Sequence, residues 1–373
     1  MTDSQRNNNQ KTLLVMAGGT GGHIFPGIAV AEELERRGWH IEWLGTADRM
    51  ESQIVPKHGF TIHFLKVKGL RGKGLLQKVQ SLFALVGAVI QSVKVIRRIN
   101  PHVVLGMGGY ASGPGGVAAK LCGKALVIHE QNAVFGLTNR FLARIASKVL
   151  LGFDQAKNRL PSGIDIEVTG NPVRRGIAQS PRADRNDGQL NVLVVGGSLG
   201  ARPFNQMLPS LLAATANVSI WHQTGRDNAT EVKSAYDDSQ CDSVKVTEFI
   251  DDMSQAYQWA DIVICRAGAI TVSEIAMAGV AAIFIPLPHA VDDHQTQNAY
   301  SLVERRAGFL ISQDHMQTEL VPLLAQLQQQ PKLLSQTRLN ALDCGISDAA
   351  QRVASIIESQ SPETRTLSTG ALL

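Results

Sequence analysis

Residues 13–23 read LLVMAGGTGGH and residues 192–200 read VLVVGGSLG, and these two similar stretches decide the fold. In each, an apolar run typical of a buried strand leads directly into a glycine-rich turn. Short apolar runs alternate with helical patterns along the rest of the chain, which indicates parallel β-α units. The two stretches lie about 180 residues apart, about one domain length. The sequence therefore predicts an α/β protein with two Rossmann-like, doubly wound parallel-sheet domains that face each other across a cleft.

The expected elements divide into two series, one for each domain. Predicted strands of the first series cover residues 12–17, 40–44, 103–105, 125–129 and 148–151, with helices over 28–37 and from 75 to about 98. Those of the second series cover residues 192–195, 218–222, 244–248, 262–265 and 281–285. We place the domains at 12–170 and 171–360, with a linker in the Pro- and Gly-containing stretch 170–189 and a last helix free to pack back on the first domain. Residues 1–11 and 361–373 lack periodicity and are expected to be disordered.

Positive charge is concentrated in one part of the first domain. The chain has 36 Lys and Arg against 32 Asp and Glu, yet no acidic residue lies between Glu51 and Glu130, where eleven of the basic residues are found. Such a surface suits an anionic lipid headgroup or membrane surface as the partner. A nucleic-acid partner is not expected. No run of about 18 apolar residues is present, so no spanning helix is expected. Four cysteines without paired spacing indicate a reducing compartment.

The first glycine-rich loop, Gly18 to His23, resembles a phosphate-binding turn. Its glycines let a ligand approach the backbone N–H groups, and the following helix points its positive end into the loop. His23 either caps the helix start or acts as a general base, since a nearby helix N-terminus keeps imidazole neutral. The loop does not fit a dinucleotide fingerprint, because Ile24 stands in place of the third glycine and no acid follows the second strand. This disfavours an oxidoreductase.

The second domain offers two further turns of this kind. Gly196 to Arg202 supplies backbone donors and the Ser198 hydroxyl. The stretch from Arg266 to Glu274 directly follows a predicted strand and opens a helix. Glu274 either accepts hydrogen bonds from ribose hydroxyls or stabilises the N-terminus of its own helix, by up to about 1 kcal/mol.

Polar residues also follow other strands. Gln295 and Asn298 could bind sugar hydroxyls or cap a helix start, and the nearby Asp and His residues have no diagnostic metal-ligand spacing. In the first domain, a third glycine-rich loop covers residues 106–116, and the tetrad His129 to Asn132 ends a strand, where site residues gather in α/β sheets.

The helix predicted from residue 75 carries an apolar stripe at 3.6-residue spacing, most of which we expect in the core. The stripe consists of Leu75, Leu76, Val79, Leu82, Phe83, Val86, Val89, Ile90, Val93 and Ile96. At its N-terminal end, Leu75, Val79 and Phe83 are flanked by Arg71, Lys73 and Lys78, a composition typical of interfacial membrane contact.

Six motifs in order carry a resemblance to a known family. They are Gly18 to His23; Gly108 to Tyr110 with Ser112 to Gly115; His129 to Asn132; Gly170 to Arg174; Gly196 to Ser198; and Thr271 to Glu274. From about Leu13 to about Ser355, the chain resembles the bacterial glycosyltransferase family that completes the lipid-linked peptidoglycan precursor (the MurG family). The resemblance implies the two-domain GT-B fold and transfer of N-acetylglucosamine, with inversion, from its UDP donor to the C4 hydroxyl of the muramyl sugar of lipid I, which gives lipid II.

The resemblance also implies roles for individual residues. His23 and Glu274 are the expected catalytic residues, and Tyr110, Ser112 and Glu130 are expected on the acceptor side. Donor binding is expected from Thr20, Gly21, Gly22, Asn132, Arg174, Ser198, Ile250, Ala269, Ile270, Thr271, Val272, Ser273, Glu274 and Gln295. No cofactor is expected; a divalent metal is not excluded, although nothing in the sequence indicates one. The enzyme is expected as a peripheral protein on the cytoplasmic face of the bacterial inner membrane, with cell-wall synthesis proteins as further partners.

Two other functions remain open at this point. One is transfer of a UDP-linked sugar to a different membrane glycolipid, which is disfavoured by the combination of the first loop with the His129 to Asn132 tetrad. The other is a non-catalytic membrane scaffold that senses a UDP-sugar, which would require His23 and Glu274 to be dispensable.

Overall fold

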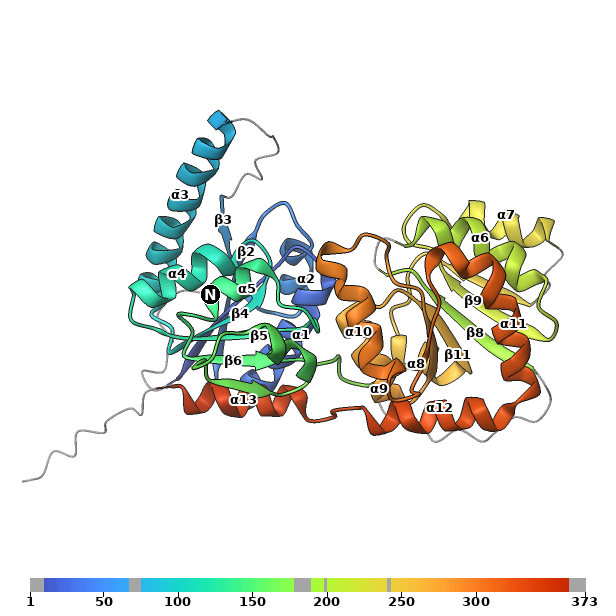
Figure 1. Ribbon diagram of the computed structural model, residues 1–373. Coiled ribbons are helices and arrows are strands. Elements are labelled where there is room, and N and C mark those ends of the chain that lie inside the picture. The colour runs from blue at the N-terminus through green and yellow to red at the C-terminus, as the bar shows by residue number, and fades with distance from the viewer. Residues whose placement is uncertain (1–9, 67–74, 178–188, 198–199, 240–242, 362–373) are drawn as a thin grey trace, which may run out of the picture.

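Two parallel sheets, each covered by helices on both faces, form the protein (Figure 1). The structure, a computed structural model, describes residues 10–66, 75–177, 189–197, 200–239 and 243–361. The seven-stranded first sheet has the order β3-β2-β1-β4-β5-β6-β7, and the six-stranded second sheet has the order β10-β9-β8-β11-β12-β13. The predicted pair of Rossmann-like domains is confirmed.

The bounds of the strands agree closely with the predicted runs. The first sheet consists of β1 (Thr12–Ala17), β2 (His40–Thr46), β3 (Thr61–Leu65), β4 (Val103–Gly108), β5 (Ala125–Glu130), β6 (Lys148–Leu151) and β7 (Ile166–Val168). The second consists of β8 (Leu190–Val195), β9 (Val218–Gln223), β10 (Val244–Thr247), β11 (Ile262–Cys265), β12 (Ala281–Phe284) and β13 (Phe309–Leu310). The sequence missed β3, β7 and β13, which lie at sheet edges, are short, and keep most of their residues partly exposed.

Helices cover both faces of each sheet. Around the first lie α1 (Gly21–Arg36), α2 (Glu51–Lys57), α3 (Leu75–Ile99), α4 (Ser112–Leu121) and α5 (Leu137–Leu142). Around the second lie α6 (Arg202–Ala213), α7 (Ala229–Asp238), α8 (Met253–Trp259), α9 (Ala269–Ala278), α10 (His294–Val303), α11 (Met316–Gln329) and α12 (Pro331–Asp343). The last helix, α13 (Ala349–Ser359), follows them in sequence but lies beneath the first sheet (Figure 1).

Apolar side chains hold α13 in that position. Val353, Ala354 and Ile357 belong to the same buried cluster as the apolar face of α1. The Arg37 guanidinium, just after α1, donates to the Glu358 carboxylate at 2.7 Å. The chain therefore crosses between its two halves twice, once before β8 and once after α12.

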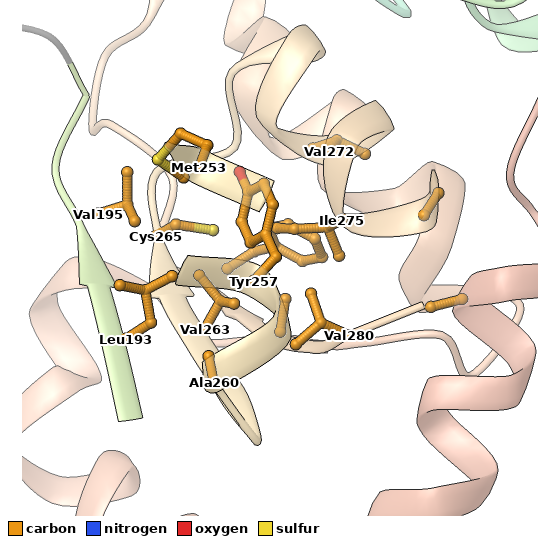
Figure 2. Close-up of a cluster of buried hydrophobic side chains, with 14 of the residues drawn as sticks. Leu193, Val195, Met253, Tyr257, Ala260, Val263, Cys265, Val272, Ile275 and Val280 are labelled. Atoms are coloured by element: carbon orange, nitrogen blue, oxygen red, sulfur yellow. The ribbon is translucent and has the colours of Figure 1, made fainter. Parts of the chain in front are cut away.

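The core of the second domain surrounds Tyr257 on α8. Figure 2 shows its ring among Leu193, Val263, Ile275 and other apolar side chains contributed by β8, β11 and α9. Only 2% of Tyr257 is exposed. The ring is therefore rigidly held at a point where α8 meets α9.

Both sheets reverse their strand order at one place, between β1 and β4 in the first and between β8 and β11 in the second. In open parallel sheets, ligands bind outside the carboxyl ends of the strands at such a point. The loops that follow these four strands are the glycine-rich segments singled out in the sequence, so the topology gathers them into two facing groups.

Helix α3 differs from the prediction for its apolar stripe. Val89, Val93 and Ile96 pack in the core, but Leu82, Phe83, Val86 and Ile90 are at least half exposed, with Phe83 at 72%. The expectation that most of the stripe is core is therefore wrong for Leu82, Val86 and Ile90, because α3 extends beyond the sheet it covers (Figure 1). The exposure of Phe83 agrees with its expected place at the exposed N-terminal end of the stripe. Arg71 and Lys73 lie outside the described residues, as do the side chains of Leu75, Lys78 and Val79.

Candidate active site

The loop after β1 becomes helical sooner than the sequence predicts. Helix α1 begins at Gly21, with extended Thr20 as its N-cap, so His23 lies in the first turn. His23 Nδ1 lies 3.2 Å from the Gly18 carbonyl oxygen. Because a carbonyl only accepts, Nδ1 must carry the proton, and Nε2 is left with its lone pair. Burial lowers the pKa of His23 below its ordinary value, against the opposing influence of Glu130, the Gly18 carbonyl and Glu51. The ring is therefore a neutral imidazole that can accept a proton at Nε2.

The loop after β4 packs directly on the first loop. A Cβ atom at Gly108 would lie 2.7 Å from His23 Cδ2, and one at Gly109 would lie 2.3 Å from the Gly18 oxygen. Both glycines also have positive φ angles, of 105° and 86°. The backbone beside His23 therefore requires glycine at both positions. Tyr110, which follows, is 58% exposed, and the Arg49 guanidinium lies 5.6 Å from the centroid of its ring.

Two predicted acceptor-side residues instead support their own loops. The Ser112 side chain is completely buried; its hydroxyl accepts from the Gly108 N–H at 3.0 Å and lies within bonding distance of the Gly108 and Met16 carbonyls. The Glu130 carboxylate, 3% exposed, accepts from Gly136 N and Asn139 Nδ2 and from both nitrogens of Asn132. The polar atoms of both side chains are therefore engaged inside the protein, and neither residue lines the cavity described below.

The tetrad after β5 meets the second domain through Asn298 of α10. The Asn298 Oδ1 accepts from the Ala133 N–H at 2.8 Å, and its Nδ2 donates to Asn132 Oδ1 at 3.2 Å and to the Ala267 carbonyl at 3.1 Å. Asn298 is completely buried, so the sugar contact considered for it from the sequence is wrong. It links the two domains instead.

Glu274 lies on α9 with both carboxylate oxygens engaged. Arg174 Nε donates to Oε1 at 3.1 Å, and the Tyr257 hydroxyl donates to Oε2 at 3.0 Å. Glu274 is only 2% exposed, and burial raises its pKa, while Arg174 and Tyr257 oppose that shift. Arg174 also lies over the ring of Phe25 on α1, 4.5 Å from the centroid. Through its ion pair with Glu274 and its contact with the ring of Phe25, Arg174 connects α9 of the second domain to α1 of the first.

A cavity of about 240 Å³ opens between the two domains at this ion pair. The first domain and linker contribute Thr20, Gly21, Gly22, Phe25 and Arg174, and the second domain contributes Val195, Gly197, Gln223, Phe249, Ile250, Met253, Tyr257, Gly268, Ala269, Ile270, Thr271 and Glu274. A neighbouring pocket of about 340 Å³ is lined by the loop after β8, with Arg266, Thr271 and Gln295. The structure therefore brings most of the predicted donor-binding residues to one cleft.

Val272 and Ser273 are placed elsewhere. Val272 is completely buried, and the Ser273 hydroxyl donates to the Ala269 carbonyl and accepts from Asn171 Nδ2, both at 3.0 Å. The two residues line a separate pocket on the other side of α9. Since a helix turns by about 100° per residue, the run from Ala269 to Glu274 cannot present all its side chains to one cleft.

The remaining predicted residues are partly engaged or not described. Gln295 lines the neighbouring pocket, where its Oε1 accepts from the Leu287 N–H at 2.9 Å. Asn132 bonds to Glu130 and Asn298, and neither it nor His23 lines the two cavities. Ser198 lies outside the described residues. Over the described ranges, no three His, Cys, Asp or Glu side chains are grouped so as to hold a metal ion.

Sequence reasoning missed several members of the site, among them Glu51, Phe25 and Tyr257. Glu51 contacts the first loop from α2, and Phe25 and Tyr257 line the cavity. Phe25 comes two residues after His23, so a helix starting at Gly21 would have placed it near the cleft. Tyr257 and Glu51 belong to short helices without a motif, and only the tertiary fold brings them to the loops.

The chain is similar to known glycosyltransferases over nearly its whole length. Residues 13–151 match the glycosyltransferase family 28 N-terminal domain, and residues 191–357 match the glycosyltransferase family 28 C-terminal domain. It is 53% identical over 360 residues to the UDP-N-acetylglucosamine--N-acetylmuramyl-(pentapeptide) pyrophosphoryl-undecaprenol N-acetylglucosamine transferase of Colwellia psychrerythraea, covering 93% of this chain and 92% of that protein. A protein of the same name from Tolumonas auensis is 52% identical over 350 residues, covering 92% and 98% of the two chains. The crystal structure of Acinetobacter baumannii MurG superposes with a TM-score of 0.80 at 37% identity, over 94% of this chain and 99% of that one.

Proposed function

Because the chain belongs to glycosyltransferase family 28, we propose that it transfers N-acetylglucosamine from UDP-N-acetylglucosamine to the C4 hydroxyl of the muramyl sugar of lipid I, forming lipid II. The family predicted from the six motifs is thereby confirmed. The structural observation that carries the proposal is the cleft at the switch points of both sheets, where the His23 loop faces the Glu274 helix. Curated N-acetylglucosamine transferases are about 50% identical to this chain over most of its length. These relatives disfavour both transfer to another glycolipid and a non-catalytic scaffold.

The donor occupies the second-domain side of the cleft in this proposal. Ile250, Ala269, Ile270 and Thr271 offer an apolar and backbone surface for the nucleoside, and Glu274 offers carboxylate lone pairs to the ribose hydroxyls. The N-terminus of α9 and the loop after β8 present backbone N–H groups to the diphosphate. Arg174, which lines the same cavity, supplies positive charge.

His23 serves as the general base. Its Nδ1 is committed to Gly18, its Nε2 is unprotonated, and the ring lies in the first turn of α1. An inverting transfer needs one base to remove the proton of the incoming hydroxyl, and it needs no enzyme nucleophile. The C4 oxygen attacks C1 of the donor sugar as its proton passes to Nε2, and UDP leaves with the electrons of the broken C1–O bond.

Charge on the departing UDP is stabilised by groups already in place. Preorganised N–H dipoles and a guanidinium act strongly in a site that excludes water. We therefore propose transfer without a metal or other cofactor. Turnover that is unchanged by EDTA supports this part of the proposal, and turnover that needs added Mg²⁺ or Mn²⁺ contradicts it.

The acceptor lipid brings the enzyme to a membrane. Leu82, Phe83, Leu85, Val86 and Ile90 form an exposed apolar surface on α3, within the segment that carries no acidic residue. Exposed apolar residues on a basic part of a protein favour interfacial insertion into anionic bilayers. Among the described helices, none has the length and apolar character to cross a bilayer. We propose peripheral attachment at the cytoplasmic face of the inner membrane, where cell-wall synthesis proteins are available as partners.

The test of the function is a transfer reaction with purified protein. UDP-N-acetylglucosamine and a short-chain lipid I analogue are incubated with the enzyme, and the disaccharide product is identified by mass. Product that depends on the acceptor supports the proposal. Binding of the UDP-sugar without any product contradicts it and favours a different acceptor lipid or a scaffold.

A further inference from the structure

A buried carboxylate, Glu51, contacts the loop that carries His23. Glu51 is the first residue of α2 and is 1% exposed. Its Oε2 accepts from the Gly19 N–H at 2.9 Å, and its Oε1 accepts from the Thr46 N–H at 3.0 Å and the Thr46 hydroxyl at 2.6 Å. Burying a carboxylate is costly unless it is hydrogen-bonded, and these three donors meet that requirement.

Two glycines leave the space that this side chain fills. A Cβ atom at Gly18 would lie 2.4 Å from Glu51 Oε1, and one at Gly45 would lie 2.8 Å from Glu51 Cγ. Neither glycine has a positive φ angle, so backbone conformation does not explain why glycine stands there. Steric room for Glu51 does explain it. The loop after β1, the end of β2 and the start of α2 are thus built around one carboxylate.

The same loop sets the state of His23. The Gly18 carbonyl binds His23 Nδ1, and the adjacent Gly19 N–H binds Glu51. A short chain of contacts therefore runs from Glu51 through the Gly18–Gly19 turn to the imidazole. Burial has the largest effect on the pKa of His23 and lowers it. Glu130, the Gly18 carbonyl and, less strongly, Glu51 act in the opposite direction and raise this pKa. Glu51 therefore also acts on the ring through its negative charge.

We infer that Glu51 is a positioning residue for the transfer reaction. It holds the Gly18–Gly19 turn so that the Gly18 carbonyl fixes the ring orientation and the tautomer of His23, and it touches neither substrate. The inference rests on the proposed function, because it takes His23 as the base. The rival explanation is that Glu51 only stabilises the connection between β2 and α2.

A pair of isosteric variants separates these explanations. Glu51→Gln keeps the volume of the side chain but replaces one acceptor oxygen by an amide that cannot accept from N–H groups. Glu42→Gln is the matched control, because Glu42 is also a buried carboxylate, at 4% exposure. It lies on β2, and its contacts include His40 at 3.0 Å and His63 at 2.7 Å. Both variants lose a buried carboxylate, but only the first loses a contact to the His23 loop.

The kinetic readout is the split between kcat and KM. For Glu51→Gln we expect kcat to fall by at least about tenfold, since small displacements of a catalytic group are costly. The KM for UDP-N-acetylglucosamine should change by less than about threefold, since Glu51 does not line the donor cavity. Glu42→Gln should retain the kcat of the wild type at a comparable loss of thermal stability. Equal losses of kcat in the two variants, or a Glu51→Gln kcat within about twofold of the wild type, overturn the inference.

The second readout does not depend on activity. The pKa of His23 is followed by NMR titration of isotope-labelled histidines, with His23→Asn used to assign the signal. We expect the pKa of His23 to be lower in Glu51→Gln than in the wild type and unchanged in Glu42→Gln, because only the first removes a negative charge beside the ring. An unchanged His23 titration in Glu51→Gln overturns the inference.

Two further controls keep the test decisive. If Glu51→Gln does not fold, Thr46→Val removes only the 2.6 Å hydroxyl donor to Glu51 and should lower kcat in the same direction by a smaller factor; unaffected kcat then overturns the inference. If the proposed function itself is wrong, the wild-type protein forms no product, and this result is distinct from failure of the inference. In that case the effect of Glu51 on His23 is decided by the NMR titration alone.

Discussion

Glu274→Gln is the substitution that tests the donor site most sharply. In the wild type, Oε1 receives Arg174 Nε at 3.1 Å and Oε2 receives the Tyr257 hydroxyl at 3.0 Å. A carboxylate has about four acceptor positions, so about two are left for the ribose hydroxyls of UDP. Glutamine has the same shape but keeps only one acceptor oxygen.

The expected loss of affinity follows from the number of bonds removed. One hydrogen bond from a ribose hydroxyl to a charged acceptor is replaced by an unfavourable contact with the amide nitrogen. Hydrogen bonds to charged groups contribute about 1.5–3 kcal/mol each, which corresponds to about a 10- to 150-fold weaker Kd for UDP. This loss appears in the Kd for UDP itself, because UDP carries the ribose. The measurement therefore needs no acceptor.

Isothermal titration calorimetry with UDP measures this loss directly, and a deoxy analogue sharpens it. The wild type should bind UDP more tightly than 2′-deoxy-UDP, while Glu274→Gln should discriminate much less between the two nucleotides. Glu42→Gln, whose wild-type carboxylate lies on β2 and contacts His40 and His63, serves as the control for a buried carboxylate replaced by an amide. A Glu274→Gln protein that binds UDP within about threefold of the wild type, with its discrimination intact, refutes the placement of the ribose at Glu274.

Three other predictions concern the remaining parts of the structure. Asn298→Ala leaves the Ala133 N–H and the Ala267 carbonyl without their partner, so the free energy of unfolding should fall by about 2–4 kcal/mol in urea titrations, and hydrogen exchange at Ala133 should accelerate; unchanged exchange contradicts the domain link. Burial lowers the pKa of His129 to about 4 and that of His222 to about 3, so both are neutral in the fold, while the unfolded chain takes up their protons below about pH 6.5. Stability should therefore be fully present above pH 6.5 and fall by about 1.4 kcal/mol per pH unit for each histidine as the pH drops towards 4; His222→Gln should remove about half of that slope, and unfolding that is independent of pH in this range is the contrary result. Phe83→Ser combined with Val86→Ser should weaken binding to anionic liposomes by at least about tenfold and leave UDP binding intact; unchanged liposome binding contradicts the membrane surface on α3.

The central strands and their turns could be predicted because each carries its own local signal. β1 and β8 each contain a continuous apolar run and lead directly into glycines, and their neighbours β4 and β11 are also apolar, which is enough to define two parallel sheets. β13 has two residues and β7 has three, so neither contains a period that a sequence pattern can detect. The start of α1 was placed too late because glycine and proline disfavour helices, whereas the first turn of α1 gains from its position at the end of β1.

The candidate site was predictable only at the level of segments. The motifs located the correct loops, but which side chain faces the cleft depends on helix phase and on partners far away in sequence. Val272 and Ser273 turn away from the cleft on the same helix that presents Thr271 and Glu274 to it. Glu130 was expected on the acceptor side, and its carboxylate is instead enclosed by its own loop. Glu51 and Tyr257 reach the site through tertiary contacts for which the sequence gives no local pattern.

The most direct test of the mechanism is the turnover of His23→Ala with UDP-N-acetylglucosamine and the lipid I analogue, measured beside its Kd for UDP. The neutral ring with a free Nε2 predicts that kcat falls by about 10²- to 10⁴-fold, while the Kd for UDP stays near that of the wild type. Turnover close to that of the wild type would contradict the role of His23 as the base, and with it the chemistry assigned to this cleft.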